Sequence, residues 1–139
     1  MKDLDHVSDF LKELRNRTDS KKILVIGGGG NQNGSVSSSL EILECGLLKD
    51  NDFEEIGIAG HPEGSPDIDQ NTVNDFLNKK YELSKDKNLN LELVTQFFFN
   101  AEPFIKWCKF LDNSNIKLPV RVGFPGPASF KTLLNFGLM

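Results

Sequence analysis

The sequence predicts an α/β protein in which parallel strands alternate with covering helices. Four short apolar runs begin at Ile23, Ile56, Leu91 and Val120, roughly 30 to 35 residues apart, which is the length of one strand–loop–helix unit. Amphipathic helical patterns fill the intervals, and no hairpin signal joins two runs. Strands that alternate with helices in this way pair in parallel, so we expect one four-stranded parallel sheet.

The expected strands are short and strongly apolar. The first, ILVI, follows Lys21 and Lys22, and a continuous apolar run of this kind is typical of a parallel strand covered on both faces. Each run then breaks into polar, glycine-rich or aromatic sequence. In α/β folds ligands bind at this carboxyl edge of the sheet, so the candidate site residues are sought there. The four strands are expected at residues 23–26, 56–59, 91–94 and 119–122.

The expected helices carry apolar residues at spacings of three and four. Leu4, Val7, Leu11 and Leu14 form one such stripe near the N-terminus. Serine hydroxyls offer caps for the helix after the first strand and for the last helix. The further helices are expected at residues 40–48 after Ser37–Ser39, from Asn71 to Leu83, at Ala101–Leu111, and after Ser129.

Composition narrows the class of protein. The chain has 139 residues, of which 38% are hydrophobic and 26% charged, which suits a single domain over residues 1–139 with one core. A net charge of −4 with no basic patch argues against a nucleic-acid or membrane partner. No apolar run reaches the roughly 20 residues of a membrane span, and the N-terminus lacks a signal-peptide core. We therefore expect a cytoplasmic protein.

The two cysteines are predicted to be free. Cys45 and Cys108 both fall in amphipathic helical patterns, and the sequence has no CxxC pair. Buried thiols that act as small apolar residues are favoured over a disulfide or a metal site.

A glycine run at Gly27–Gly34, GGGGNQNG, follows the first strand. A strand–glycine–helix context suits a cradle of backbone N–H groups for phosphate. The spacing matches neither GxGxxG with a downstream acid nor GxxxxGK[ST]. A flexible glycine loop is the alternative interpretation.

Polar and aromatic residues follow the second and third strands. His61 and Glu63 in HPEGSPD could support acid–base chemistry, although its two prolines alone indicate a rigid turn. Gln96 in TQFFFN could recognise the edge of a heterocycle through its carboxamide. Phe97–Phe99 could form an aromatic wall or fill the core. Phe130, near the last helix, could stack on a planar ligand or pack inward.

Three segments in this order resemble the flavin-dependent methylenetetrahydrofolate reductase family. They are AGHPEGSPD at Ala59–Asp67, LVTQFFFNAEPF at Leu93–Phe104 and LPVRVGFPGPASFKTLL at Leu118–Leu134. The similarity extends from about Ile23 to Leu134 and corresponds to the fourth through seventh units of the family's barrel. The resemblance therefore implies a partial (β/α)₈ TIM barrel of about four βα units, where the pattern alone leaves a small open sheet equally possible.

The resemblance also implies an activity and a set of site residues. In the family, FAD lies across the strand ends, is reduced by NADH or NADPH, and passes hydride to methylenetetrahydrofolate to give methyltetrahydrofolate. By position, two residues would contact the folate, Gln96 and Phe130. The flavin would be contacted by Gly28, Gly29, Ala59, His61, Ser65 and either Lys79 or Lys80.

Three departures from the family limit the expected activity. Gly29 stands where the family has an aspartate, and Ser65 where it often has histidine. The family's proton-donating glutamate lies on a strand that these four units do not include. We therefore expect no catalysis by this chain alone. We also expect the edge strands of its sheet to pair with a second copy of the chain or with a complementary chain. The alternative function is a non-catalytic α/β module that binds a flavin, a nucleotide or a protein.

Overall fold

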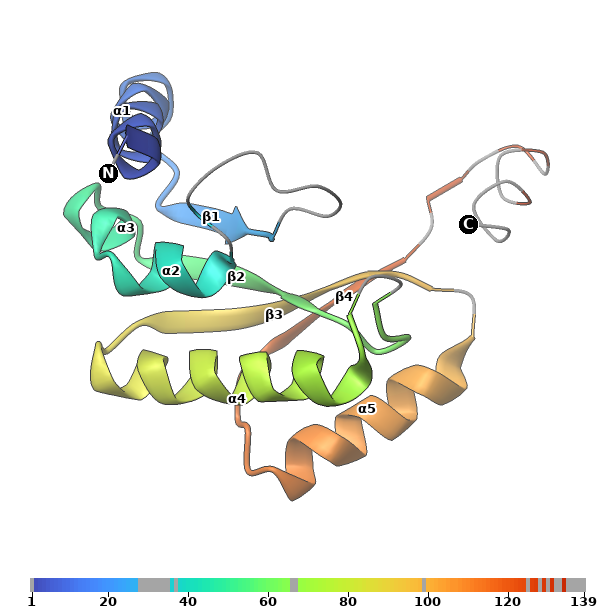
Figure 1. The fold of residues 1–139 in the computed structure, drawn as a ribbon. Coiled ribbons are helices and arrows are strands. Elements are labelled where there is room, and N and C mark those ends of the chain that lie inside the picture. The colour runs from blue at the N-terminus through green and yellow to red at the C-terminus, as the bar shows by residue number, and fades with distance from the viewer. Residues whose placement is uncertain are drawn as a thin grey trace.

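The computed structural model describes residues 2–27, 36, 38–65, 68–98, 100–124, 126–127, 129, 131 and 134. Its four strands form one sheet in the order β1-β2-β3-β4, and every neighbouring pair is parallel (Figure 1). The prediction of a four-stranded parallel sheet is therefore confirmed. The strands are β1 (Lys22–Val25), β2 (Glu55–Gly60), β3 (Asn90–Phe97) and β4 (Val120–Gly123).

Helices connect the strands as predicted, with one difference. The helix expected after β1 is divided in two, because Gly46 adopts a left-handed conformation with φ of 81°, which a glycine enters without steric cost. The final helix expected after Ser129 lies largely outside the described residues. The helices are α1 (Lys2–Arg17), α2 (Ser39–Glu44), α3 (Leu47–Asp50), α4 (Gln70–Asp86) and α5 (Ala101–Asn113).

Side-chain caps fix the start of the two long helices that follow β2 and β3. The Asp69 carboxylate accepts hydrogen bonds from the backbone N–H groups of Asn71 and Thr72. The side-chain oxygen Oδ1 of Asn100 accepts one from the backbone N–H of Glu102. Such caps satisfy N–H groups that have no partner inside the helix. They anchor the N-termini of α4 and α5 close to the carboxyl ends of the strands.

The sequential strand order places the helices on one face of the sheet. Parallel crossovers are right-handed, so consecutive units added in one direction all carry their helices to the same side. Figure 1 shows α4 and α5 on the same side of the sheet. On that face the strands contribute fully buried residues to the core, and they pack with Trp107 and Leu111 of α5. These strand residues are Ile56, Ile58, Leu91 and Leu93.

The opposite face of the sheet, called here the uncovered face, has no helix packed on it among the described residues. Leu24 is 50% exposed there, and Ile26, just beyond β1, is 67% exposed. Within the part of the chain that the structure describes, the expectation that the first strand is covered on both faces is therefore wrong. From the strand register, the uncovered face consists of Lys22, Leu24, Glu55, Gly57, Ala59, Asn90, Glu92, Val94 and Arg121.

Charges on the uncovered face are paired within the sheet. Lys22 on β1 forms an ion pair with Glu55 on β2. Arg121 on β4 donates two hydrogen bonds to Glu92 on β3, at 3.1 and 2.8 Å, and this guanidinium lowers the pKa of the Glu92 carboxyl. These pairs neutralise the face, which leaves its apolar residues near the carboxyl edge as its unpartnered surface.

Two further predictions concern thiols and membranes. Cys45 and Cys108 are free, as predicted, but both are half-buried rather than fully buried. Partial burial raises the pKa of the Cys108 thiol. Among the residues that the structure describes, no helix is long and apolar enough to cross a membrane.

Candidate functional site

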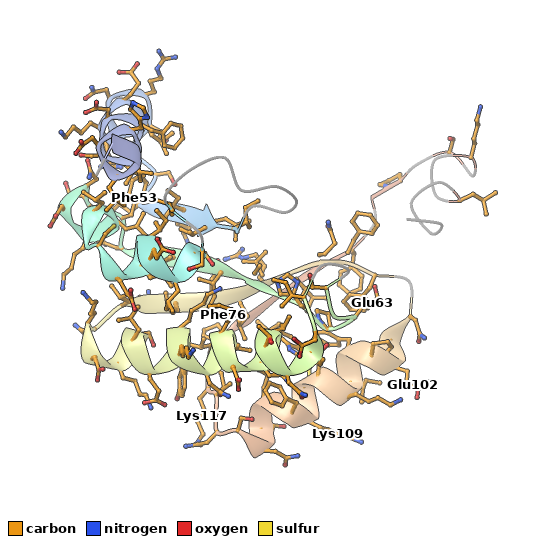
Figure 2. All side chains as sticks on the ribbon, viewed as in Figure 1. Phe53, Glu63, Phe76, Glu102, Lys109 and Lys117 are labelled. Carbon is orange, nitrogen blue, oxygen red and sulfur yellow. The ribbon has the colours of Figure 1, made fainter. Side chains whose placement is uncertain are left out.

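A cavity of about 710 Å³ lies at the carboxyl ends of β1, β2 and β3. This volume is within the range of roughly 300–1,000 Å³ that is typical of small-molecule sites. α4 supplies one wall, and Trp107 of α5 contributes from beneath the end of β2. Phe76, labelled in Figure 2, lines the cavity from α4. Half of the lining residues are apolar, namely Leu24, Ile26, Ala59, Ile68, Val73, Phe76, Leu77, Val94 and Trp107.

Five residues assigned to the site from the sequence line this one cavity. They come from four places in the chain: the end of β2, the loop that follows it, the middle of α4 and the end of β3. Parallel strands bring their carboxyl ends to a common edge, which explains how segments so far apart in sequence meet. The five residues are Ala59, His61, Ser65, Lys80 and Gln96.

The structure separates the two adjacent lysines. Lys80 lines the cavity. Lys79 is exposed, and its ammonium lies 5.5 Å from the centre of the Phe76 ring. Neighbouring residues of an α-helix point about 100° apart, so only one of two adjacent lysines can face a given cavity. The remaining assigned residues, Gly28, Gly29 and Phe130, lie outside the described residues.

The cavity is rich in hydrogen-bond donors. Burial, and then the charge of Lys80, lowers the pKa of His61, while burial lowers the pKa of Lys80. No described carboxylate forms an ion pair with Lys80, and none of the described lining residues is Asp or Glu. In a chain with net charge −4, the cavity therefore favours an anionic or acceptor-rich ligand.

Gln96 is one of two polar residues at the end of β3 that line the cavity, and the other is Thr95. The Gln96 Oε1 accepts a hydrogen bond from the backbone N–H of Phe97 at 3.2 Å. An N–H group requires an acceptor, so this contact fixes which end of the carboxamide is oxygen. The two donors of the amide nitrogen then remain for a ligand.

Sequence reasoning missed Trp107 as a cavity residue. It lies on the apolar side of α5, as predicted, but its ring also reaches beneath Gly60 and is only 4% exposed. A Cβ atom at Gly60 would lie 2.8 Å from the Trp107 Cη2 atom. A glycine inside a strand signals such a close approach. That signal at Gly60 was available in the sequence, but it did not reveal the partner.

The aromatic run after Gln96 packs on α5. The Phe98 ring stacks on Phe104 with centroids 5.1 Å apart and also contacts Phe124 at 6.3 Å. The cavity lining does not include Phe97 or Phe98. Phe98 is half-buried and packs on the rings of Phe104 and Phe124 instead of lining the cavity, and Phe99 lies outside the described residues.

The described residues contain no cluster of three or more His, Cys, Asp or Glu side chains suited to a metal ion. A comparison of the chain with known protein-family models finds no match.

Proposed function

We propose that the cavity binds FAD and that this chain is a part or a short relative of a flavin-dependent methylenetetrahydrofolate reductase. One observation supports this proposal most strongly. The residues that the resemblance assigned to flavin and folate contacts, where described, line one cavity at the strand ends, with Lys79 as the exception. Of the two lysines between which the sequence left a choice, Lys80 lines the cavity, and this supports its assignment.

The chemistry of the lining fits a flavin dinucleotide. Its apolar and aromatic wall suits a planar ring system, and Lys80 has the charge to pair with a diphosphate. His61 and Ser65 add polar groups on the loop after β2. When bound, FAD would supply hydride transfer between a reduced nicotinamide and methylenetetrahydrofolate, while these side chains bind and orient it.

The uncovered face supports a barrel rather than an open sheet as the complete architecture. In a (β/α)₈ barrel all helices lie outside and one sheet face lines the interior. Here the helices cover one face, and the other face is neutralised by its own ion pairs. We propose that further strands, from a second copy or from another chain, close the barrel against β1 and β4.

A second candidate function is flavin or nucleotide binding without catalysis. The favouring observation is the composition of the lining. His61 and Lys80 are the titratable groups among its described residues, with no carboxylate. Gly29 also replaces the family's aspartate. A general acid contributes typically 10²–10⁴-fold to rate, so its absence would leave a binding site with little turnover.

FAD titration tests the binding proposal. Trp107 is the chain's only tryptophan, and it lines the cavity, so bound flavin should quench its fluorescence. We expect Lys80→Met to weaken binding about tenfold, the size of one charge-assisted hydrogen bond, and His61→Ala to weaken it less. Lys79→Met is the matched control and should bind like the wild type. Equal losses for the two lysine variants, or no quenching at all, would contradict the site assignment.

A turnover assay tests whether the chain alone catalyses the family's reaction. The FAD-loaded chain is given methylenetetrahydrofolate and NADH or NADPH, and methyltetrahydrofolate is measured. We expect FAD binding with no detectable turnover by the chain alone. If turnover is seen, Gln96→Ala should abolish it. Turnover that survives Gln96→Ala would show that the folate contact is wrongly assigned.

A further inference from the structure

Thr95 is a buried polar residue on β3, next to the cavity residue Gln96. Its side chain is 5% exposed. Its Oγ1 accepts a hydrogen bond from the backbone N–H of Gly123 on β4, at 3.0 Å. This hydrogen bond ties a side chain of β3 to the backbone of β4.

The β3–β4 ladder is irregular at this point. Val94 pairs with Arg121, whereas Phe97 pairs with Gly123. Two residues of β3, Thr95 and Gln96, therefore lie opposite one residue of β4. An extra residue of this kind bends the strand locally and re-aims its side chains.

Close contact between the strands makes the irregularity sterically specific. A Cβ atom at Gly123 would lie 2.8 Å from the Thr95 carbonyl oxygen and 2.9 Å from the Phe97 nitrogen. Both neighbours are backbone atoms, which cannot move aside as the end of a side chain can. Glycine and the Thr95 hydroxyl therefore act together to hold the two strands at this separation.

We propose that Thr95 is a positioning residue that holds the Gln96 carboxamide in its orientation at the cavity. The Thr95–Gly123 hydrogen bond fixes the irregular segment, and the Phe97 N–H then binds the Gln96 oxygen. This leaves the Gln96 amide donors to meet the ligand. The matching ligand edge is a hydrogen-bond acceptor, such as a ring carbonyl or an unprotonated ring nitrogen. Only the nature of that ligand rests on the proposed function.

The test compares two substitutions by NMR of the ligand-free protein. Thr95→Val keeps the shape but removes the hydroxyl, and Thr95→Ser keeps the hydroxyl. We expect Thr95→Val to shift the Gln96 side-chain NH₂ and Phe97 backbone signals. We also expect faster exchange of the Gly123 amide, by about tenfold for one lost hydrogen bond. Thr95→Ser should keep the Gln96 signals, the Phe97 signals and the exchange rate of the Gly123 amide as they are in the wild type.

Ser84→Ala is the matched control for a general loss of stability. Ser84 is also 5% exposed, and its hydroxyl donates to the Tyr81 carbonyl in α4 at 2.6 Å. We expect this control to lower stability without moving the Gln96 signals. If Thr95→Val behaves in the same way, its role is only structural and the proposal is overturned.

Hydrogen exchange tests the proposal where NMR of Thr95→Val is not feasible. If Thr95→Val does not fold, hydrogen exchange of the wild type serves instead, and a Gly123 amide that exchanges like an open loop overturns the proposal. If the protein self-associates, exchange followed by mass spectrometry over the peptides containing Gln96 and Gly123 replaces NMR. A wild type that fails to bind FAD would refute the proposed function and leave these ligand-free results in force.

Discussion

The two faces of the sheet are made by alternate residues of the same strands, yet they have different environments. On the helix-covered face, Ile58 and Leu93 are fully buried. On the uncovered face, Leu24 is half exposed and the neighbouring charges pair with one another. Strand propensity cannot create this difference, since both sets of residues share one backbone. It follows from sequential right-handed crossovers, which carry the connecting helices of the described residues to one side.

The largest expected effect is the difference in stability between the faces. Ile58→Ala should lower the free energy of unfolding by about 2–5 kcal/mol, because it leaves a cavity in a fully buried position. Leu24→Ala on the uncovered face should cost less than about 1 kcal/mol, because much of its side chain is already in water. Urea denaturation of the two variants measures both. Similar losses would mean that the uncovered face is covered in solution.

The second largest expected effect is a loss of stability when the close contact between Gly60 and Trp107 is disturbed. Gly60→Ala should cost about 1–3 kcal/mol, because its new methyl group overlaps the Trp107 ring. Trp107→Phe removes the overlapping part of the ring, so Gly60→Ala should cost less in that background. Thermal unfolding of the four proteins in this cycle, followed by circular dichroism, tests the coupling. If the losses of stability from the two single substitutions simply add in the double variant, the contact between Gly60 and Trp107 is refuted.

Self-association tests whether the uncovered face is an interface. The wild type should sediment as a dimer or larger species at roughly tens of micromolar, where exposed strand edges associate. Leu24→Glu should weaken association by about tenfold or more, because it places an unpaired charge on the face. Phe10→Glu, at an exposed position on α1, is the control. A wild type that remains a monodisperse monomer would argue against the partial-barrel architecture.

The smallest expected effect is the pH dependence of stability due to His61. Burial and Lys80 lower the pKa of His61 in the folded state, so as pH falls the unfolded state binds a proton first. Stability should therefore fall as pH drops through about 6.5, the unfolded value. His61→Asn should flatten this slope, measured by urea denaturation, and His6→Asn on α1 is the control. An unchanged slope in His61→Asn would remove His61 as its source.

Much of the fold was predictable from local sequence. Apolar runs and helical stripes located all four strands and the long helices, because periodicity reports directly which element buries its apolar residues. The boundaries shifted where caps decide them, as at Asp69 before α4. Gly46 divided a predicted helix because its backbone conformation ends α2. His61 and Gln96 were predictable as cavity residues because strand ends of a parallel sheet share an edge.

The sequence by itself determined the elements, the parallel sheet and the edge on which the candidate site lies. Only the tertiary structure decided that Lys80 rather than Lys79 faces the cavity, that Trp107 packs beneath Gly60, and that no described helix covers one face of the sheet. The reason is physical. Periodicity is a property of neighbours in sequence, whereas these three features depend on contacts between elements whose relative positions are set by crossover handedness and close packing.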